Sequence, residues 1–427
     1  MELQGEMRRR MENRAPWFRF ENGNFYIENI DYRTLVEKYG TPLVCFSRNR
    51  LRENARHIKE SFRNHYERTK IFYAYKANYF GPILSDLKEY CGAEVISNLE
   101  LQLACRVGVP NENIIFNGVG KTKEELEFCV ENDILVNVDS LSEIDKLDSL
   151  AAEHGKKFSI GLRVHPELRE YEENAFIKSG SKLGLDIKSD AEKAINKILK
   201  KKHLQLRGLH AHSYSRQTQP QMHLYALDSM INFAKRLEDV YDIQLDFLDI
   251  GGGFDTRAVL ERTGHIDYFA RKISERMKQL GTDIFLYLEP GRYIVNDAGV
   301  VITKIITEKT NKDRKWLITD IATNFLIPVK NANFEVIPAD LTGRNEEELN
   351  FGGGICSSAD VIEEKVILPS MKEEEYAVVL NCGAYTSVMS EQFVYPRPRV
   401  VYIDKSDVRT LWERENIEDA IKLYIGG

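Results

Sequence analysis

Ile71-Phe-Tyr-Ala-Tyr-Lys76-Ala-Asn78 is the stretch from which the fold can be worked out. Apolar and aromatic residues run directly into a lysine, which is typical of a buried strand that ends in a polar group. Seven later runs have the same short apolar character: Ala93–Ser97, Ile114–Asn117, Ile134–Val138, Phe158–Val164, Leu206–His212, Phe247–Ile250 and Ile284–Leu288. Segments rich in Glu, Lys, Leu and Ala, such as Lys123–Glu131 and Ser189–Lys202, separate these runs and are typical of helices. The alternation predicts parallel strands, each followed by a helix.

Eight strands are the number that closes a (β/α)8 barrel, although an open, doubly wound sheet can be built from the same alternation. We favour the barrel because a chemically useful residue follows nearly every strand, and a barrel brings all these strand ends to one rim. The positions are Lys76, Asn98, Asn117, Asp139, His165, His212, Gly251 and Glu289. The predicted fold class is therefore α/β, with a TIM-like barrel as its larger part.

The character of the sequence changes after residue 292. Six short extended runs follow with few helical stretches between them: Val300–Ile306, Lys315–Thr319, Glu335–Pro338, Glu363–Leu368, Tyr376–Leu380 and Arg399–Ile403. Trp17–Ile27 also looks extended, and we expect that it can add a strand to this later sheet. The prediction has three parts: an N-terminal segment, 1–38, that packs with the β domain, a barrel, 39–292, and a β-rich C-terminal domain, 293–427.

Composition narrows the classes of function. Of 427 residues, 43% are hydrophobic and 29% are charged, as in an ordinary globular protein. A net charge of −7 argues against a broad nucleic-acid surface, and no apolar run approaches the ~18 residues of a transmembrane helix. The six cysteines form no CxxC pair and no zinc-binding spacing, so we expect reduced thiols in a cytoplasmic protein and no metal site.

Lys76 is the first candidate for a residue with a chemical role, because a lysine rarely closes an apolar strand. One interpretation is a strand-end side chain whose ammonium group reaches water. The other is an amine held in a site, with its pKa lowered by burial so that it can bond covalently to a carbonyl carbon. The sequence around Lys76 alone leaves both interpretations open.

Two glycine-containing turns follow the last two strands. Gly251-Gly252-Gly253 lets backbone N–H groups converge on an anion, and its pattern differs from the GxGxxG of dinucleotide-binding proteins. Glu289-Pro-Gly291-Arg292 places a carboxylate where it can hydrogen-bond a ring nitrogen, beside two residues that extend an anion site. The simpler interpretations are a strand-to-helix turn for the glycines and a structural pair of Glu289 and Arg292.

Four further positions come from the sixth strand and the later segments. Strand alternation sends His210 and His212 to one face, but no third metal ligand is evident nearby, so His210 is expected to be a packed core residue. His212 is nearer the rim and can stack on a flat cofactor ring. Cys356, which follows three glycines, is either an inert thiol or a positioned acid. Tyr385 offers a phenol that can donate to a phosphate.

Taken in order, these residues resemble the fold-type III pyridoxal-phosphate decarboxylases, the group of diaminopimelate, ornithine and arginine decarboxylases, with the diaminopimelate branch closest. The likeness covers most of the chain. The motifs that carry it are Tyr-Ala-Tyr-Lys76-Ala-Asn, Ala-Glu94-Val-Ile-Ser, Leu-Arg163-Val-His-Pro, Ser-Lys182-Leu-Gly, His210-Ala-His212, Gly251-Gly-Gly, Glu289-Pro-Gly-Arg292, the Cys356 to Asp360 segment and Gly383-Ala-Tyr385. The resemblance implies pyridoxal 5'-phosphate as cofactor, α-decarboxylation of an amino acid, and a homodimer with shared active sites.

The resemblance also assigns roles to residues. Lys76 would hold the cofactor covalently, His212 would stack on its ring and Glu289 would pair with the ring nitrogen. The phosphate would be held by Ser215, Gly251, Gly252, Gly253, Gly291, Arg292 and Tyr385. Cys356 would reach into the neighbouring subunit's site as the acid that protonates Cα. Arg292, Ser357 and Asp360 would bind the substrate, with Asp360 near its distal end.

Three positions depart from the diaminopimelate branch. Tyr214 replaces a glycine beside the phosphate, so the phosphate cup must be reshaped. Ser357 replaces a glutamate that grips the distal ammonium group, and Pro328 replaces an arginine that binds the distal carboxylate. Losing these two charge-assisted contacts removes about 1.5–3 kcal/mol each. We therefore expect a diamino acid or a related amino-acid intermediate of a specialised pathway as substrate, rather than clearly meso-diaminopimelate.

Other functions use parts of the same residue set. An amino-acid racemase shares the barrel and the lysine, but needs a tyrosine as second base and typically an arginine where this chain has Glu289. A non-catalytic, regulatory relative commonly lacks the lysine or the thiol, and both are present here as Lys76 and Cys356. A phosphosugar enzyme would explain the glycines but not the combination of Lys76, Glu289 and Cys356.

Overall fold

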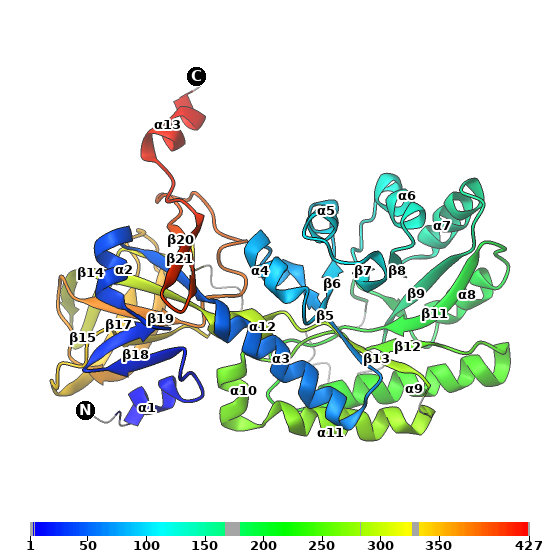
Figure 1. The fold of residues 1–427 in the computed structure, drawn as a ribbon, viewed down its shortest axis with the longest axis horizontal. Coiled ribbons are helices and arrows are strands. Elements are labelled where there is room, and N and C mark those ends of the chain that lie inside the picture. Colours follow the sequence, from blue (N-terminus) through cyan, green and yellow to red (C-terminus); the bar gives the residue numbers. More distant parts are fainter. Residues whose placement is uncertain (1–2, 4, 167–179, 282, 327–332, 426–427) are drawn as a thin grey trace. The chain divides into compact units, whose positions relative to one another are not determined.

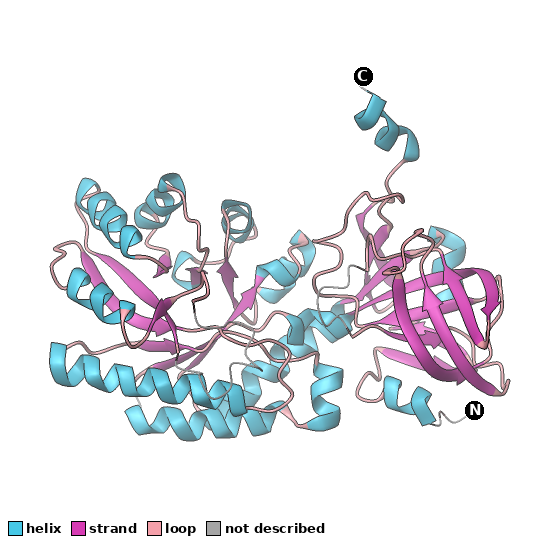
Figure 2. Cartoon of the chain, turned by 180° about the vertical axis from the view of Figure 1, so that it is seen from behind, coloured by secondary structure: helices cyan, strands magenta, loops and turns pink. Residues whose placement is uncertain are grey.

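The computed structural model describes residues 3, 5–166, 180–281, 283–326 and 333–425 (Figure 1). The chain divides into two compact units. The barrel unit comprises Asn54–Asp255 and Val259–Tyr293, and the β unit comprises Met1–Glu53, Thr256–Ala258 and Ile294–Gly427. Figure 2 shows helices around the strands of the barrel unit, whereas strands dominate the β unit.

Eight parallel strands form the closed barrel, in the order in which they follow one another in the chain. They are β5 (Thr69–Ala74), β6 (Gly92–Val95), β7 (Ile114–Phe116), β8 (Leu135–Val138), β9 (Phe158–His165), β11 (Leu204–His210), β12 (Phe247–Asp249) and β13 (Phe285–Leu288). The last strand returns to the first, with Leu286 opposite Thr69. A two-residue strand, β10 (Leu185–Asp186), pairs with β9. The predicted barrel is confirmed, and each of its strands coincides with one of the eight apolar runs.

Helices alternate with the barrel strands, and three of them begin at a side-chain cap. They are α3 (Arg48–His65), α4 (Gly81–Leu87), α5 (Asn98–Arg106), α6 (Lys123–Glu131), α7 (Leu141–Glu153), α8 (Asp190–Ile198), α9 (Gln221–Tyr241), α10 (Arg257–Thr263) and α11 (Ile266–Met277). Thr122 and Glu125 form a capping box at α6, and Ser97 and Ser140 cap α5 and α7. These caps satisfy N–H groups that a helix leaves unpaired at its start, so they determine where each rim loop ends.

The β unit contains a nine-stranded sheet in which β4 (Leu43–Ser47) is a central strand. The other strands are β14 (Gly299–Asn311), β15 (Arg314–Thr319), β16 (Glu335–Pro338), β17 (Glu346–Gly352), β18 (Val361–Pro369), β19 (Tyr376–Leu380), β20 (Arg399–Asp404) and β21 (Asp407–Trp412). The unit also holds α1 (Gly5–Met11), α2 (Tyr32–Tyr39) and α13 (Ile417–Ile425), and α12 (Arg292–Val295) leads into it. The β-rich C-terminal domain is thus confirmed, with β17 and β21 added.

The strand that the N-terminal part adds to this sheet differs from the predicted one. Trp17–Ile27 contributes β1 (Phe18–Glu21) and β2 (Asn24–Ile27) to a separate three-stranded sheet, completed by β3 (Ile30–Asp31). β4 instead joins the large sheet, antiparallel to β14 and parallel to β20. All five of its side chains are buried, as expected of a strand with neighbours on both sides. The β unit therefore takes in the chain as far as Glu53, beyond the expected boundary at residue 38.

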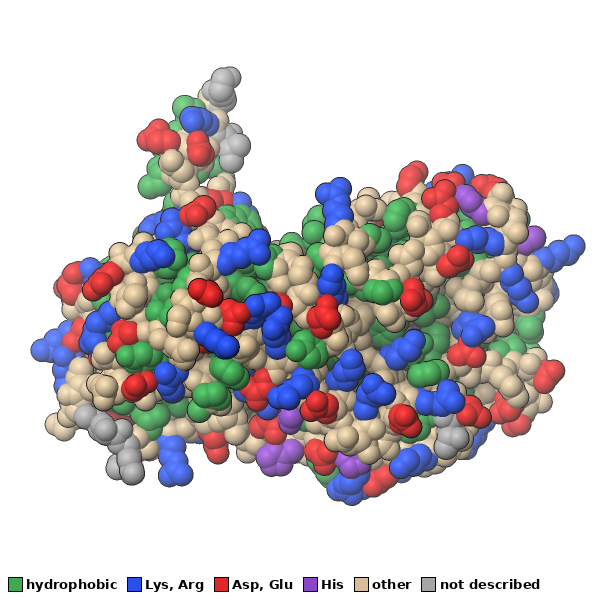
Figure 3. All heavy atoms as spheres, in the orientation of Figure 1, with side chains coloured by type: hydrophobic (Ala, Val, Ile, Leu, Met, Phe, Trp, Pro, Cys, Tyr) green, Lys and Arg blue, Asp and Glu red, His purple; other side chains and the backbone are tan. Residues whose placement is uncertain are grey.

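Charges of both signs are mixed over the face of the molecule drawn in Figure 3. No helix in the described part of the chain has the length and apolar character needed to cross a membrane.

A buried ion pair holds the start of α3 within the β unit. The Arg50 guanidinium donates to Asp297 over 2.7 Å, and both side chains are almost fully buried. Asp297 also accepts from the backbone N–H of Ala258 over 2.9 Å. Burial opposes ionisation of Asp297, but the Arg50 charge outweighs it, so the pKa of the carboxyl lies below its ordinary value.

Arg50→Met should leave Asp297 buried without its hydrogen-bonded guanidinium, and the free energy of unfolding in urea should fall by about 3–5 kcal/mol at neutral pH. Because the folded pKa of Asp297 lies below the unfolded value, the contribution of the pair is present above the unfolded pKa and is lost as pH falls. The difference between variant and wild type should therefore shrink below about pH 4. Arg68→Met, at an exposed pair with Asp283, is the control, and an equal loss there would contradict the interpretation.

Candidate active site

The site is built at the carboxyl ends of the barrel strands, as the sequence predicted. Lys76 lies in a 3-10 turn, Tyr75–Ala77, directly after β5. Glu94 lies in β6, and Asn117, Asp249 and Glu289 lie at or directly after the ends of β7, β12 and β13. Parallel strands in a closed barrel present these ends on one rim, so residues distant in sequence meet there.

Lys76 is held by a buried carboxylate while its side chain stays partly open. Its Nζ forms an ion pair with Oε2 of Glu94, whose side chain is 1% exposed, whereas that of Lys76 is 34% exposed. Ion pairing of this kind orients an amine, and the remaining exposure leaves it accessible to a small molecule. Lys76 is thus more than a strand-end side chain that extends into water.

Glu289 carries a charge inside the barrel. Its Oε1 accepts from Asn117 Nδ2 over 2.5 Å, and its Oε2 lies 3.2 Å from Nε2 of His210. Burial opposes ionisation, but His210 and the charge of Lys76 outweigh it, so the pKa of Glu289 lies well below its usual range. A buried carboxylate that stays ionised can hold a proton on a ring nitrogen.

Asp249 is the neighbour of Glu289 that the sequence did not single out. Burial and the adjacent charge of Glu289 raise the pKa of Asp249 well above its usual range, which favours the protonated form of this carboxyl group. The potential ligand atoms of His210, Asp249 and Glu289 lie within 4.8 Å of one another. The sequence had shown no third metal ligand near the two histidines. A carboxyl group that keeps its proton is a poor metal ligand, so the cluster is better suited to stabilising one charged carboxylate.

His212 presents a neutral ring at the rim. Its Nδ1 lies 3.1 Å from the backbone N–H of Gly252, which donates to it. Loss of water around the ring and the nearby charge of Lys76 lower the pKa of His212 to about 3. An uncharged, flat imidazole is the state that suits stacking on a planar group.

The three glycines are packed too closely to carry side chains. A Cβ at Gly252 would lie 2.2 Å from the carbonyl oxygen of Glu289, and one at Gly251 would lie 2.5 Å from Nδ1 of His212. Gly253 has φ of +89°, a backbone conformation that favours glycine. Gly291 is equally confined, because its Cβ would lie 2.9 Å from that of Ala77. Backbone alone therefore forms this part of the rim, next to the exposed Ser215 and the half-buried Arg292.

The side chain of Tyr214 does not enter the loop formed by Gly251, Gly252 and Gly253. Its ring is fully buried, packs 4.2 Å from the ring of His223, and its hydroxyl donates to the carbonyl of Ile250 over 3.2 Å. A Cβ on Gly253 would lie 2.8 Å from the Tyr214 ring. We expected Tyr214 to reshape the phosphate cup. In the structure its ring packs behind the glycine loop.

The remaining predicted residues lie in the β unit. Cys356 and Ser357 are exposed, and Tyr385 is half-buried with φ of +60°. Asp360 is buried, and its two carboxylate oxygens accept from the backbone N–H groups of Thr323 and Ile355 over 2.8 and 2.7 Å. Asp360 thus shapes the loop that carries Cys356, and its contact with substrate stays a prediction. Pro328 lies outside the described residues.

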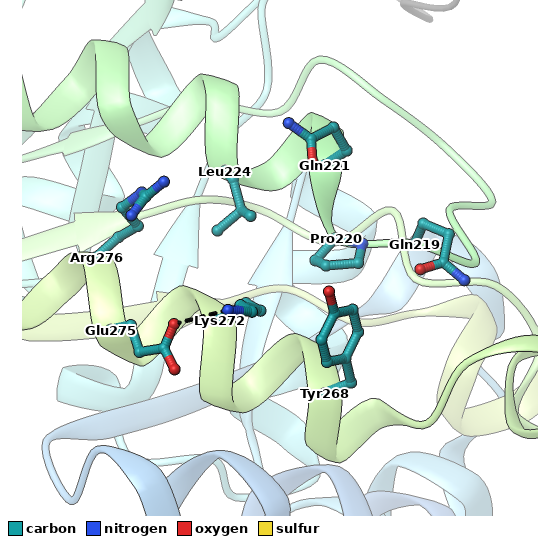
Figure 4. Close-up of a pocket in the computed structure, with 8 residues that line it drawn as sticks. All are labelled: Gln219, Pro220, Gln221, Leu224, Tyr268, Lys272, Glu275 and Arg276. Carbon is teal, nitrogen blue, oxygen red and sulfur yellow. Dashed lines mark hydrogen bonds and ion pairs between the residues drawn. The ribbon is translucent and has the colours of Figure 1, made fainter.

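A separate hollow of about 260 Å³ lies between the start of α9 and α11 in the barrel unit (Figure 4). Its basic side chains are paired within the protein: Lys272 with Glu275 at 3.1 Å, and Arg276 with Asp228 at 3.0 Å. None of the predicted site residues lines it, so we assign it no part in the active site.

Comparisons with known proteins agree with this arrangement. A family model described as "Pyridoxal-dependent decarboxylase, pyridoxal binding domain" matches residues 48–296. Diaminopimelate decarboxylases of Aquifex aeolicus and Campylobacter jejuni are 30% and 32% identical to this chain, covering 94% and 92% of it and 96% and 98% of those proteins. The crystal structure of diaminopimelate decarboxylase from M. jannaschii matches with a TM-score of 0.90 and 28% identity, over 96% of this chain and 98% of that one. The same enzyme in co-complex with L-lysine matches with a TM-score of 0.88 and 27% identity, over 96% of this chain and 98% of that one.

The rim residues fit pyridoxal phosphate. An accessible amine, Lys76, stands beside a buried, ionised carboxylate, Glu289, and a neutral ring, His212. The glycine loop leaves backbone where a Cβ would collide with its neighbours, as a closely approached phosphate requires.

Gly252→Ala should weaken pyridoxal phosphate binding at least about tenfold, because the added Cβ would push against the carbonyl of Glu289 and displace both rim segments. Equilibrium titration followed by absorbance measures the dissociation constant. The matched control is Gly120→Ala, where a Cβ meets nothing within 4 Å. Equal affinities in the two variants would show that the close approach at Gly252 does not shape the site.

Proposed function

Because the chain belongs to the pyridoxal-dependent decarboxylase family, we propose that it removes the α-carboxyl group of a diamino acid or a related amino-acid intermediate. The observation that carries this proposal is that one barrel rim holds both the partly exposed amine of Lys76, ion-paired with Glu94, and the buried charge of Glu289. An α-decarboxylation leaves an electron pair on Cα, and a positive ring nitrogen paired with a carboxylate is suited to stabilise it.

Each rim residue has a distinct part in this reaction. Pyridoxal phosphate, when bound, draws electrons away from the bond to the departing carboxyl group. Lys76 supplies the amine that holds the aldehyde covalently, and Glu289 keeps a negative charge at the ring nitrogen. His212 offers its neutral ring for stacking. Ser215, the glycine loop, Gly291, Arg292 and Tyr385 hold the phosphate.

Cys356 is proposed as the acid that delivers a proton to Cα after carbon dioxide has left. Its thiol is exposed, on a loop stabilised by the buried Asp360. We propose further that the protein is a homodimer in which Cys356 serves the active site of the second copy. Such an arrangement would make each site depend on two chains.

The substrate is the finer part of the proposal. The relatives named above are diaminopimelate decarboxylases, and one was solved with L-lysine. In this chain Ser357 is a short, uncharged side chain on the Cys356 loop, which argues against a strong grip on a distal ammonium group. We therefore propose a diamino acid or a modified relative rather than meso-diaminopimelate itself.

Lys76→Ala should abolish carbon dioxide release, because the variant lacks the amine that the buried Glu94 holds at the rim. The assay uses purified protein with pyridoxal phosphate, a panel of diamino acids and the isomers of diaminopimelate. Borohydride reduction followed by peptide mapping should label wild type on the peptide from Tyr75 to Asn78. Lys70→Ala, near the start of β5 and away from the rim, is the control and should keep both label and turnover.

Turnover at the wild-type rate by Lys76→Ala would remove the proposed function. Strong wild-type activity on the meso isomer would keep the reaction but overturn the proposed substrate.

Cys356→Ala should slow turnover by about 10²–10⁴-fold or misdirect protonation, while the cofactor stays bound, because the variant lacks only the proton donor. Product analysis in deuterated water reports where the proton is added. Cys105→Ala, at a half-buried thiol in α5, is the matched control. An unchanged rate and product in Cys356→Ala would exclude this thiol from the reaction.

A further inference from the structure

A single amide group joins the two carboxylates of the candidate site. Asn117 follows β7 and is 3% exposed. Its Nδ2 donates to Oε1 of Glu289 over 2.5 Å and to Oε1 of Glu94 over 3.2 Å. The sequence did not indicate this contact, because Glu94, Asn117 and Glu289 lie in or directly after three different strands, β6, β7 and β13.

The orientation of the Asn117 amide follows from its partners. Ionised carboxylates only accept hydrogen bonds, so the NH₂ group must face Glu94 and Glu289. On the other side, Oδ1 of Asn117 accepts from Nδ2 of Asn137 over 2.7 Å. Asn137 is fully buried, and a Cβ on Gly161 would lie 1.8 Å from its Oδ1, so its position is restricted as well. The hydrogen bond from Asn137 therefore favours the same orientation of the Asn117 amide.

The amide completes a continuous path through the barrel. Oε2 of Glu94 pairs with Lys76, and Oε2 of Glu289 meets His210. Asn117 occupies the remaining oxygen of both carboxylates. The amine that would hold the cofactor and the carboxylate that would face its ring nitrogen are thus joined through one donor group.

Building on the proposed function, we propose that Asn117 is a positioning residue that orients Glu94 and Glu289 together and keeps both carboxylates charged during the reaction. Two negative groups that share one donor in a water-poor interior repel each other. Without the amide, one of them would relieve the repulsion by taking up a proton or by turning away. Asn137, whose hydrogen bond orients the amide, contributes through Asn117.

Other ionisable groups surround this path and affect its response to pH. Lys76, Glu100, His210, His212 and Asp249 face Glu94 or Glu289 from neighbouring strands, turns and α5. Burial, followed by the charge of Glu94, raises the pKa of Glu100 to about 7. The experiment therefore compares variants that leave these five groups in place.

Asn117→Leu removes the donor and keeps a side chain of similar size. We expect kcat to fall about 10- to 100-fold with KM little changed, from hydrogen bonds to charged groups that are no longer made. Loss of a hydrogen bond to a charged carboxylate raises its pKa, so the acid limb of the pH profile of kcat should move to higher pH by about one unit. The dissociation constant of pyridoxal phosphate, measured by absorbance titration, should rise about tenfold.

Two further variants separate positioning from packing. Asn137→Leu keeps the Asn117 donor but removes the hydrogen bond that orients its amide. We therefore expect smaller changes, in the same direction, in kcat, in the acid limb and in the dissociation constant of pyridoxal phosphate. Asn350→Leu removes a fully buried amide of β17, in the β unit, that donates to the carbonyl of Lys315 over 2.9 Å. It should lower the melting temperature without moving the acid limb or the cofactor affinity.

An acid limb and cofactor affinity in Asn117→Leu that match wild type would overturn the inference, whatever its stability. Changes in Asn350→Leu equal to those in Asn117→Leu would overturn it too, because any buried amide would then have the same effect. Absence of cofactor binding and of carbon dioxide release in wild type would instead remove the proposed function on which the inference is built.

Discussion

A carboxylate that stays charged inside the barrel is the constraint on which the site depends. Glu289 is buried, and burial alone would favour its neutral form. Its ionisation is maintained by His210, by the charge of Lys76, by Asn117 and by the proton that Asp249 keeps. Each of these groups comes from a different strand. Glu289 can therefore stay ionised only when the barrel has closed and brought these groups together.

The same closure explains the glycines. The turn after β12 passes so near the turn after β13 that Gly252 has no room for a Cβ beside the carbonyl of Glu289. The ring of Tyr214 is packed behind the loop and uses the space that a side chain on Gly253 would need. Backbone N–H groups are thereby kept at the surface of the rim, where an anion can approach them.

In the β unit, hydrogen bonds hold the loop that carries Cys356. Asp360 uses both carboxylate oxygens to hold backbone N–H groups, which leaves Cys356 on an ordered yet exposed loop. The phenol of Tyr395 donates to the carbonyl of Gly354 over 3.0 Å and anchors the same loop. A thiol presented in this way is suited to work on a molecule that the loop does not itself enclose. This exposure supports the proposal, which comes from the family resemblance, that a second copy completes the site.

The sequence by itself determined the eight barrel strands and the position of Lys76 and Glu289 at their ends, because apolar runs and polar strand ends are local patterns. It missed β17 and β21, whose exposed, charged residues hide the alternation, and it did not identify β4, which lies in the range 39–292 that we assigned to the barrel. The partnership of Asp249, His210 and Asn117 with Glu289 was decided only by the tertiary structure. These residues are up to 172 positions apart, and only the closed parallel barrel brings them within hydrogen-bonding distance.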